Sequence, residues 1–133
     1  MKVLTLSFCV AMSLNGIAQL PLENTSNCDV RVSLYLAKLP DCSIVDTMDF
    51  LVTSNGGSQL ATPPSGMEFI SSMVKFDSCS ASSSIRIDPD GCGSCPQNFP
   101  SQGTLVVDST GCGNCEYVNL AWINCDNHYI IDN

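Results

Sequence analysis

Apolar and polar residues alternate along most of the chain after residue 28, which is the pattern of β-strands that bury one face. The clearest segment is residues 30–36, where every second residue is Val or Leu. Residues 68–76 fit a strand, but the spacing of their apolar side chains also fits a short helix. The alternation predicts further strands at residues 43–46, 48–53, 84–88, 104–108, 116–124 and 129–131.

Turn-forming sequences separate these segments and set the expected fold class. They include Asn55-Gly56-Gly57, Pro63-Pro64-Ser65-Gly66 and Pro89-Asp90-Gly91. About seven or eight short strands with frequent turns favour an antiparallel arrangement over parallel βαβ units. We therefore predict an all-β fold, a small antiparallel β-sandwich of seven to eight short strands stapled by disulfides.

The first residues have the organisation of an export signal. Lys2 gives a positive start, residues 3–14 are mostly apolar, and Gly16 and Ala18 place small residues at the positions that signal peptidase recognises. The apolar run is too short to span a bilayer, which requires about 20 residues. The sequence therefore predicts a protein that is secreted or placed on the cell surface, with no membrane span.

Three parts of the chain follow from this interpretation. Residues 1–18 are the predicted signal peptide, residues 19–27 a flexible N-terminal arm, and residues 28–133 a single disulfide-rich β-domain. The arm contains the sequon Asn24-Thr25-Ser26, which carries a glycan only in a eukaryotic host.

The charge balance is strongly acidic and limits the classes of partner. The chain has 13 acidic and 5 basic side chains, and a formal net charge of −8. Such a surface repels nucleic acid, whose binding depends on Lys and Arg contacts to phosphates. We expect no nucleic-acid partner; an extracellular protein, a glycan, or a second copy bound through an edge strand remain open.

The cysteines predict a disulfide framework. Cys9 leaves with the signal peptide, and an even number in an exported chain is typical of structural disulfides. Cys28 flanks the first clear strand and Cys125 the last long one, so we expect them to pair, and we expect Cys42 to pair with Cys79. The disulfide candidates are Cys28, Cys42, Cys79, Cys92, Cys95, Cys112, Cys115 and Cys125.

A repeated motif is the most specific feature of the sequence. Gly-Cys-Gly-Ser-Cys at residues 91–95 returns as Gly-Cys-Gly-Asn-Cys at residues 111–115, and each copy follows a predicted strand. The segment 96–103 is long enough to carry the chain back across a sheet. We therefore expect both cysteine loops at the same end of the domain, with their four sulfurs close together.

Three kinds of chemistry suit these four sulfurs. Structural disulfides are favoured, and the glycines supply the positive φ angles that tight loops need. The alternative is zinc held by Cys92, Cys95, Cys112 and Cys115, whose spacing resembles that of zinc ribbons. Against zinc, Pro96 and Glu116 replace the glycine that commonly follows such a pair. A redox Cys-x-x-Cys is disfavoured because the chain lacks a βαβ context.

Other candidate sites are weaker. His128 lies near Asp126, but no serine stands in a nucleophile-elbow pattern, so catalysis is not favoured. Trp122 lies on the predicted strand 116–124 and fits the core better than a sugar-binding platform. Three aspartates, Asp88, Asp90 and Asp108, offer oxygens to calcium, although turn chemistry explains them equally well.

These observations favour a non-catalytic secreted or cell-surface β-domain that acts as a structural, adhesive or binding module. The first alternative is a zinc-binding domain that uses the paired Cys-x-x-Cys loops. The second is a small secreted enzyme or an enzyme inhibitor. No cofactor is expected under the favoured interpretation.

Overall fold

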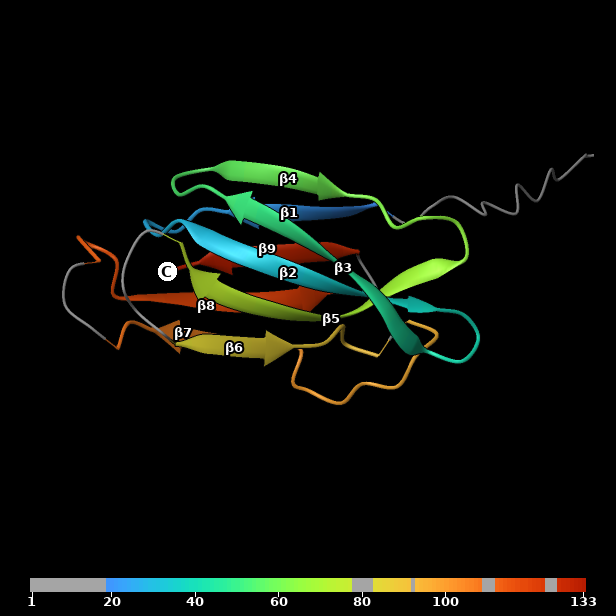
Figure 1. The fold of residues 1–133 in the computed structure, drawn as a ribbon. Coiled ribbons are helices and arrows are strands. Elements are labelled where there is room, and N and C mark those ends of the chain that lie inside the picture. The colour runs from blue at the N-terminus through green and yellow to red at the C-terminus, as the bar shows by residue number, and fades with distance from the viewer. Residues whose placement is uncertain (1–18, 78–82, 92, 109–111, 124–126) are drawn as a thin grey trace, which may run out of the picture.

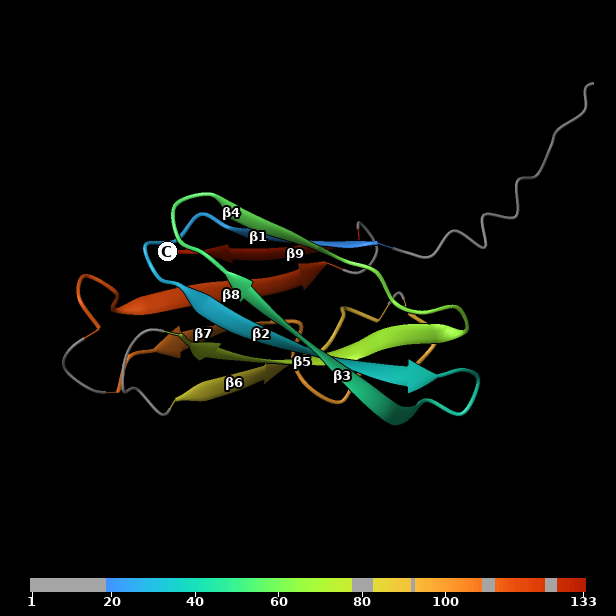
Figure 2. The same cartoon turned by 45° about the horizontal axis from the view of Figure 1, so that its top comes forward.

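The computed structural model describes residues 19–77, 83–91, 93–108, 112–123 and 127–133. These residues form nine strands in two sheets that pack face to face, as Figures 1 and 2 show. Across the first sheet, sheet A, the order is β4 (Gly57–Ala61), β1 (Leu20–Asn24), β9 (His128–Asp132), β8 (Tyr117–Ile123) and β7 (Gln102–Val106). Across sheet B the order is β3 (Ser43–Val52), β2 (Val30–Lys38), β5 (Met67–Phe76) and β6 (Ser84–Ile87). The predicted all-β sandwich is confirmed.

The alternation in the sequence becomes the core between the sheets. In β2 the alternate residues from Val30 to Leu36 are fully buried, since this strand lies between β3 and β5 and turns one face to sheet A. Residues 67–76 form strand β5, which excludes the short helix. The predicted strands 43–46 and 48–53 are one strand, β3, and Val45 is the extra residue of a bulge opposite Leu36 and Ala37.

The two sheets are joined at the centre of the core by a hydrogen bond between side chains. The Tyr129 hydroxyl on β9 lies 2.8 Å from Ser72 Oγ on β5, and Ser72 Oγ donates to the Ile87 carbonyl at 3.0 Å. The ring of Tyr129 contacts that of Trp122, with centroids 5.4 Å apart. Burial raises the pKa of Tyr129 well above its usual range, although the Ser72 hydrogen bond opposes this effect. Trp122 is buried, as predicted.

The predicted flexible arm is wrong, because residues 20–24 form β1 inside sheet A. The strand pairs with β4 antiparallel and with β9 parallel. Leu20 and Leu22 point into the core, and Asn24 and Ser26 continue the buried face as hydrogen-bonded polar groups. The strand is short and one of its three buried residues, Asn24, is polar, so its apolar alternation is too brief to predict a strand. The edge strand β4 has no alternation of buried and exposed residues, since Ala61 is its one buried residue and Gly57 belongs to the predicted turn.

The described residues contain no helix that is long and apolar enough to cross a membrane. Residues 1–18, the predicted signal peptide, lie outside the described part of the chain.

Candidate functional site

The first cysteine loop, residues 88–101, closes on itself where it leaves β6. Asp88 N–H donates to the Pro100 carbonyl at 3.0 Å. The Asp88 carboxylate accepts hydrogen bonds from the backbone N–H groups of Asn98 and Phe99 at 2.7 and 2.9 Å. The chain therefore returns to the point where β6 ended, and β7 starts there and runs back along the sandwich.

This return overturns the expected meeting of the two cysteine loops. The second cysteine loop, residues 107–116, follows β7 and emerges at the opposite end of the molecule from the first (Figures 1 and 2). Residues 96–101 do not cross the sheet, because residues 98–100 are held beside Asp88 at the end of β6. The hydrogen bonds of Asp88 instead hold the two ends of the first loop together.

Three further contacts attach the first loop to sheet B. Cys95 forms a disulfide with Cys42 in the turn between β2 and β3. Ser94 N–H donates to the Glu68 carboxylate at 3.1 Å. The Arg86 guanidinium lies between two rings, 4.9 Å from the centroid of Tyr35 and 4.5 Å from that of Phe99.

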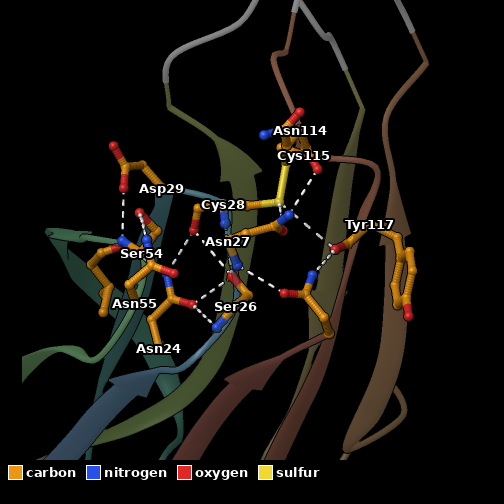
Figure 3. The surroundings of a disulfide bond; sticks show 12 residues. Asn24, Ser26, Asn27, Cys28, Asp29, Ser54, Asn55, Asn114, Cys115 and Tyr117 are labelled. Carbon is orange, nitrogen blue, oxygen red and sulfur yellow. Dashed lines mark hydrogen bonds between the residues drawn. A yellow bond between two sulfur atoms is a disulfide. The ribbon is translucent and has the colours of Figure 1, made fainter.

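The second loop is attached at the other end of β2, where Cys115 forms a disulfide with Cys28 (Figure 3). Asn27 Nδ2 donates to the Asn114 carbonyl at 2.8 Å. The two disulfides between described residues therefore flank β2, the strand with the most completely buried face. Each joins a loop between two strands of the sandwich to one end of this strand.

A buried polar cluster lies directly beneath the second loop. Asn24 is fully buried, and its Nδ2 donates to the carbonyls of Cys28 and Val52 at 2.7 and 2.9 Å. Its Oδ1 accepts from both N–H and Oγ of Ser26 (Figure 3). Nδ2 is the atom to which a glycan would be attached. In the folded protein the sequon is therefore a structural element and offers no accessible amide.

The cysteine pairing in the structure differs from the pairing that the sequence predicts. The expected pairs Cys28–Cys125 and Cys42–Cys79 are wrong, because Cys28 and Cys42 have other partners. Cys112 is also disulfide-bonded. Cys79, Cys92 and Cys125 lie outside the described residues.

The structure does not bring the proposed zinc ligands into one cluster. Cys95 and Cys115 are bonded to different partners at opposite ends of the sandwich, and neither sulfur is a thiolate. The described residues contain no group of three or more His, Cys, Asp or Glu that could hold a metal ion.

The other candidate residues have structural partners. Asp88 is buried, and its Oδ1 accepts from Ser71 Oγ at 2.6 Å while its Oδ2 closes the first loop. Asp90 and Asp108 also form interactions within the protein. His128 Nε2 lies 2.8 Å from Glu23 Oε2 on β1, and Asp126 is outside the described residues.

A groove of about 370 Å³ on the outer face of sheet A is lined by several polar side chains. It lies over β7, β8 and β9. The register places Thr104, Asn119 and Asp132 side by side in one row across these strands. The next row contains Gln102, Ala121 and Ile130. Thr104 Oγ1 donates to Asn119 Oδ1 at 2.9 Å, which orients the amide.

The groove combines polar groups with apolar surface. Ala121 and Ile130 give an apolar strip beside the row of hydroxyl, amide and carboxylate groups. On the same outer face, the exposed pair Val106 and Tyr117 continues β7 and β8 beyond that row. The arrangement offers hydrogen-bond donors and acceptors next to surfaces suited to C–H groups.

Sequence reasoning missed this groove because its polar row is assembled from three separate segments. The alternation of residues 117–123 shows that Tyr117 and Asn119 share a face, but it does not show which face is buried. Thr104 and Asp132 join them only through the strand order of sheet A. The pairing of β8 with both β7 and β9 brings the three residues into one row.

Comparison with known proteins adds no assignment: the chain matches no protein-family model, no curated protein and no solved structure.

Proposed function

We propose that this protein is a non-catalytic, secreted or cell-surface binding module whose partner is a neutral glycan held in the groove of sheet A. The observation that carries the proposal is the row Thr104, Asn119 and Asp132, with Gln102 beside it. The described disulfides suggest an extracellular or oxidising environment, and this setting suits the predicted export of the chain.

The chemistry of the row matches that of a sugar ring. Neighbouring strands are about 4.8 Å apart, so adjacent side chains of a row can contact neighbouring hydroxyl groups of one ring. Asn and Gln amides donate and accept, Thr does both through one oxygen, and the Asp carboxylate accepts. Ala121 and Ile130 can contact the C–H face of the same ring.

The charge of the protein selects among glycans. With a net charge of −8, the domain repels sulfated, phosphorylated or sialylated ligands. Among the groove residues, Asp132 alone carries a formal charge, and it is negative. A neutral oligosaccharide avoids this repulsion, whereas an anionic one does not.

The edge strand β3 is poorly suited to self-association, which favours a ligand on the face of a sheet over pairing through this edge. On the outer strand β3, the bulge at Val45 and the side chains of Asp46 and Asp49 disfavour pairing with a second chain. Gln59 Nε2 also donates to the Leu51 carbonyl at 3.1 Å, which occupies part of the same edge.

Binding to an array of neutral and anionic oligosaccharides tests the proposal, followed by calorimetric titration of the best neutral ligand. Asn119→Ala should weaken binding by about tenfold, which corresponds to roughly 1.4 kcal/mol. Thr104→Ala should act in the same direction.

Thr47→Ala is the matched control for Thr104→Ala, since Thr47 is an exposed threonine of β3 in the other sheet. It should leave binding unchanged. Equal losses in both threonine variants, a preference for anionic sugars, or binding to a protein in place of any glycan would refute the assignment.

A further inference from the structure

The first and last described strands lie side by side and run in the same direction. β1 and β9 pair in parallel, with Leu22 opposite Tyr129, Glu23 opposite Ile130 and Asn24 opposite Ile131. Because the strands are parallel, the chain enters β1 at one end of the sandwich and leaves β9 at the other. Figures 1 and 2 show these two points on opposite sides of the molecule.

This geometry determines how tension applied at the start of β1 and at the end of β9 would act. A pull on the residues before β1 and after β9 draws the two strands past each other along their axes. The hydrogen bonds between them lie across that direction, so all of them are loaded together. In an antiparallel pair pulled from one end, the bonds break one after another, and each rupture needs little force.

Additional contacts reinforce both ends of the β1–β9 pair. Beyond the end of β1, Thr25 N–H donates to the Ile131 carbonyl at 2.9 Å, and Asn27 N–H donates to Asn133 Oδ1 at 2.8 Å. At the opposite end, Asn127 Nδ2 donates to the Gln19 carbonyl. The strands are therefore tied together on either side of the paired region.

A disulfide limits how far the chain extends if this pair breaks. Cys28 follows β1 closely, and its bond to Cys115 spans a sequence separation of 87 residues. Tension passes along residues 19–28, across the sulfur–sulfur bond, and along residues 115–133. Residues 29–111 lie outside this path, so the disulfide limits the length of chain that tension can release.

We propose that the domain is a tension-bearing module, in which β1–β9 resists a pull applied at the start of β1 and the end of β9, and Cys28–Cys115 is a covalent stop. This property would suit an adhesive role, since a module bound to a fixed surface must keep its fold while it is pulled. The proposal does not depend on the groove or on the identity of its ligand.

Single-molecule force spectroscopy on the oxidised protein tests this proposal with two attachment geometries. The first geometry pulls on the two ends of the chain. The second pulls between the N-terminal end and a handle at the exposed Ser65, which lies after β4. β1 and β4 are antiparallel, so the second geometry opens them one pair at a time, with the same β1 in both experiments.

We expect a several-fold higher rupture force for the end-to-end geometry. The length released after rupture should be at most about 100 Å, against about 400 Å for the whole chain after residue 18 when extended. After reduction of the disulfides, the full length should be released.

Two results would overturn the proposal: rupture forces that are equal in the two geometries, or release of the whole chain from the oxidised protein. Loss of glycan binding in the groove variants would leave both measurements unchanged, so the two proposals can fail separately.

Discussion

The two cysteine loops share a sequence motif but are held in place by different physics. The first loop, at one end of the sandwich, is held by ionisable side chains: the buried carboxylate of Asp88, the carboxylate of Glu68 and the guanidinium of Arg86. The second, at the other end, lies over a buried and uncharged network centred on Asn24. Each loop has one described disulfide to an end of β2.

This difference shows that a repeated motif need not mark a repeated site. Both copies provide a cysteine and a glycine with positive φ, Gly91 in the first and Gly113 in the second. The neighbouring strands decide what each copy contacts. The motif is therefore better understood as a way to connect loops covalently to the sandwich than as one shared binding site.

The largest expected effect is the removal of each described disulfide as a pair. A crosslink of this span lowers the entropy of the unfolded chain, and its removal should lower the free energy of unfolding by about 4–5 kcal/mol. The two sequence separations, 87 and 53 residues, change this value only slightly. The variant Cys28→Ala with Cys115→Ala should lose about 1 kcal/mol more, because Cys28 is buried and leaves a cavity.

Urea unfolding of both double variants measures this difference. Replacing both cysteines of a pair avoids a free thiol that would form wrong disulfides. If the pair Cys42→Ala with Cys95→Ala lost as much free energy of unfolding or more, the second loop would not be the more deeply integrated of the two.

Truncation of the two polar anchors should give the next largest effects. Asn24→Ala leaves the carbonyls of Cys28 and Val52 without their buried donor and should cost about 3 kcal/mol. Asp88→Ala should cost less, about 2 kcal/mol, because water can replace the lost carboxylate at the part-buried N–H groups of Asn98 and Phe99.

Hydrogen exchange separates a local effect from a global one in these variants. Asp88→Ala should speed exchange at Asn98 and Phe99 more than in the core strands. Asn24→Ala should speed exchange throughout, since its cluster joins β1 to β2 and β3. A uniform increase in the Asp88 variant would show that the first loop is as integral to the fold as the second.

The sequence predicted the parts of the fold that depend on local alternation. Each of the strands β2, β3, β5, β6, β7, β8 and β9 overlaps a predicted segment. β1 was missed because its buried face continues into Asn24, a polar residue that is stable in the core only through its hydrogen bonds. The sequence around Asn24 indicates a glycosylation sequon, and nothing in it indicates a buried residue that donates hydrogen bonds.

The disulfide pairing and the groove could not be predicted for a related reason. Which cysteine meets Cys28 depends on the direction in which β7 runs, and that direction depends on how Asp88 closes the first loop. The row of Thr104, Asn119 and Asp132 depends on the order of strands in sheet A. Both are long-range properties with no local signal.

The smallest effect concerns Tyr129, which belongs to neither loop and therefore provides a reference for both. Tyr129→Phe removes the hydroxyl that meets Ser72 Oγ and should cost about 1 kcal/mol at neutral pH. Ser72 keeps its bond to the Ile87 carbonyl, so little else changes. Because the lost contact joins the two sheets, stability should fall without preferential loosening of either loop.

The pH dependence of this variant gives a second readout. Burial raises the pKa of Tyr129 in the folded state, so the folded protein holds the phenol proton more tightly than the unfolded chain does. Below about pH 10 both states are neutral at this residue, and stability is unaffected. Above it the unfolded chain loses the proton first, so stability falls by up to about 1.4 kcal/mol per pH unit. Urea unfolding between pH 8 and pH 11 should show this decline in the native protein and a shallower one in Tyr129→Phe; parallel declines would mean that the phenol is not held neutral by the core.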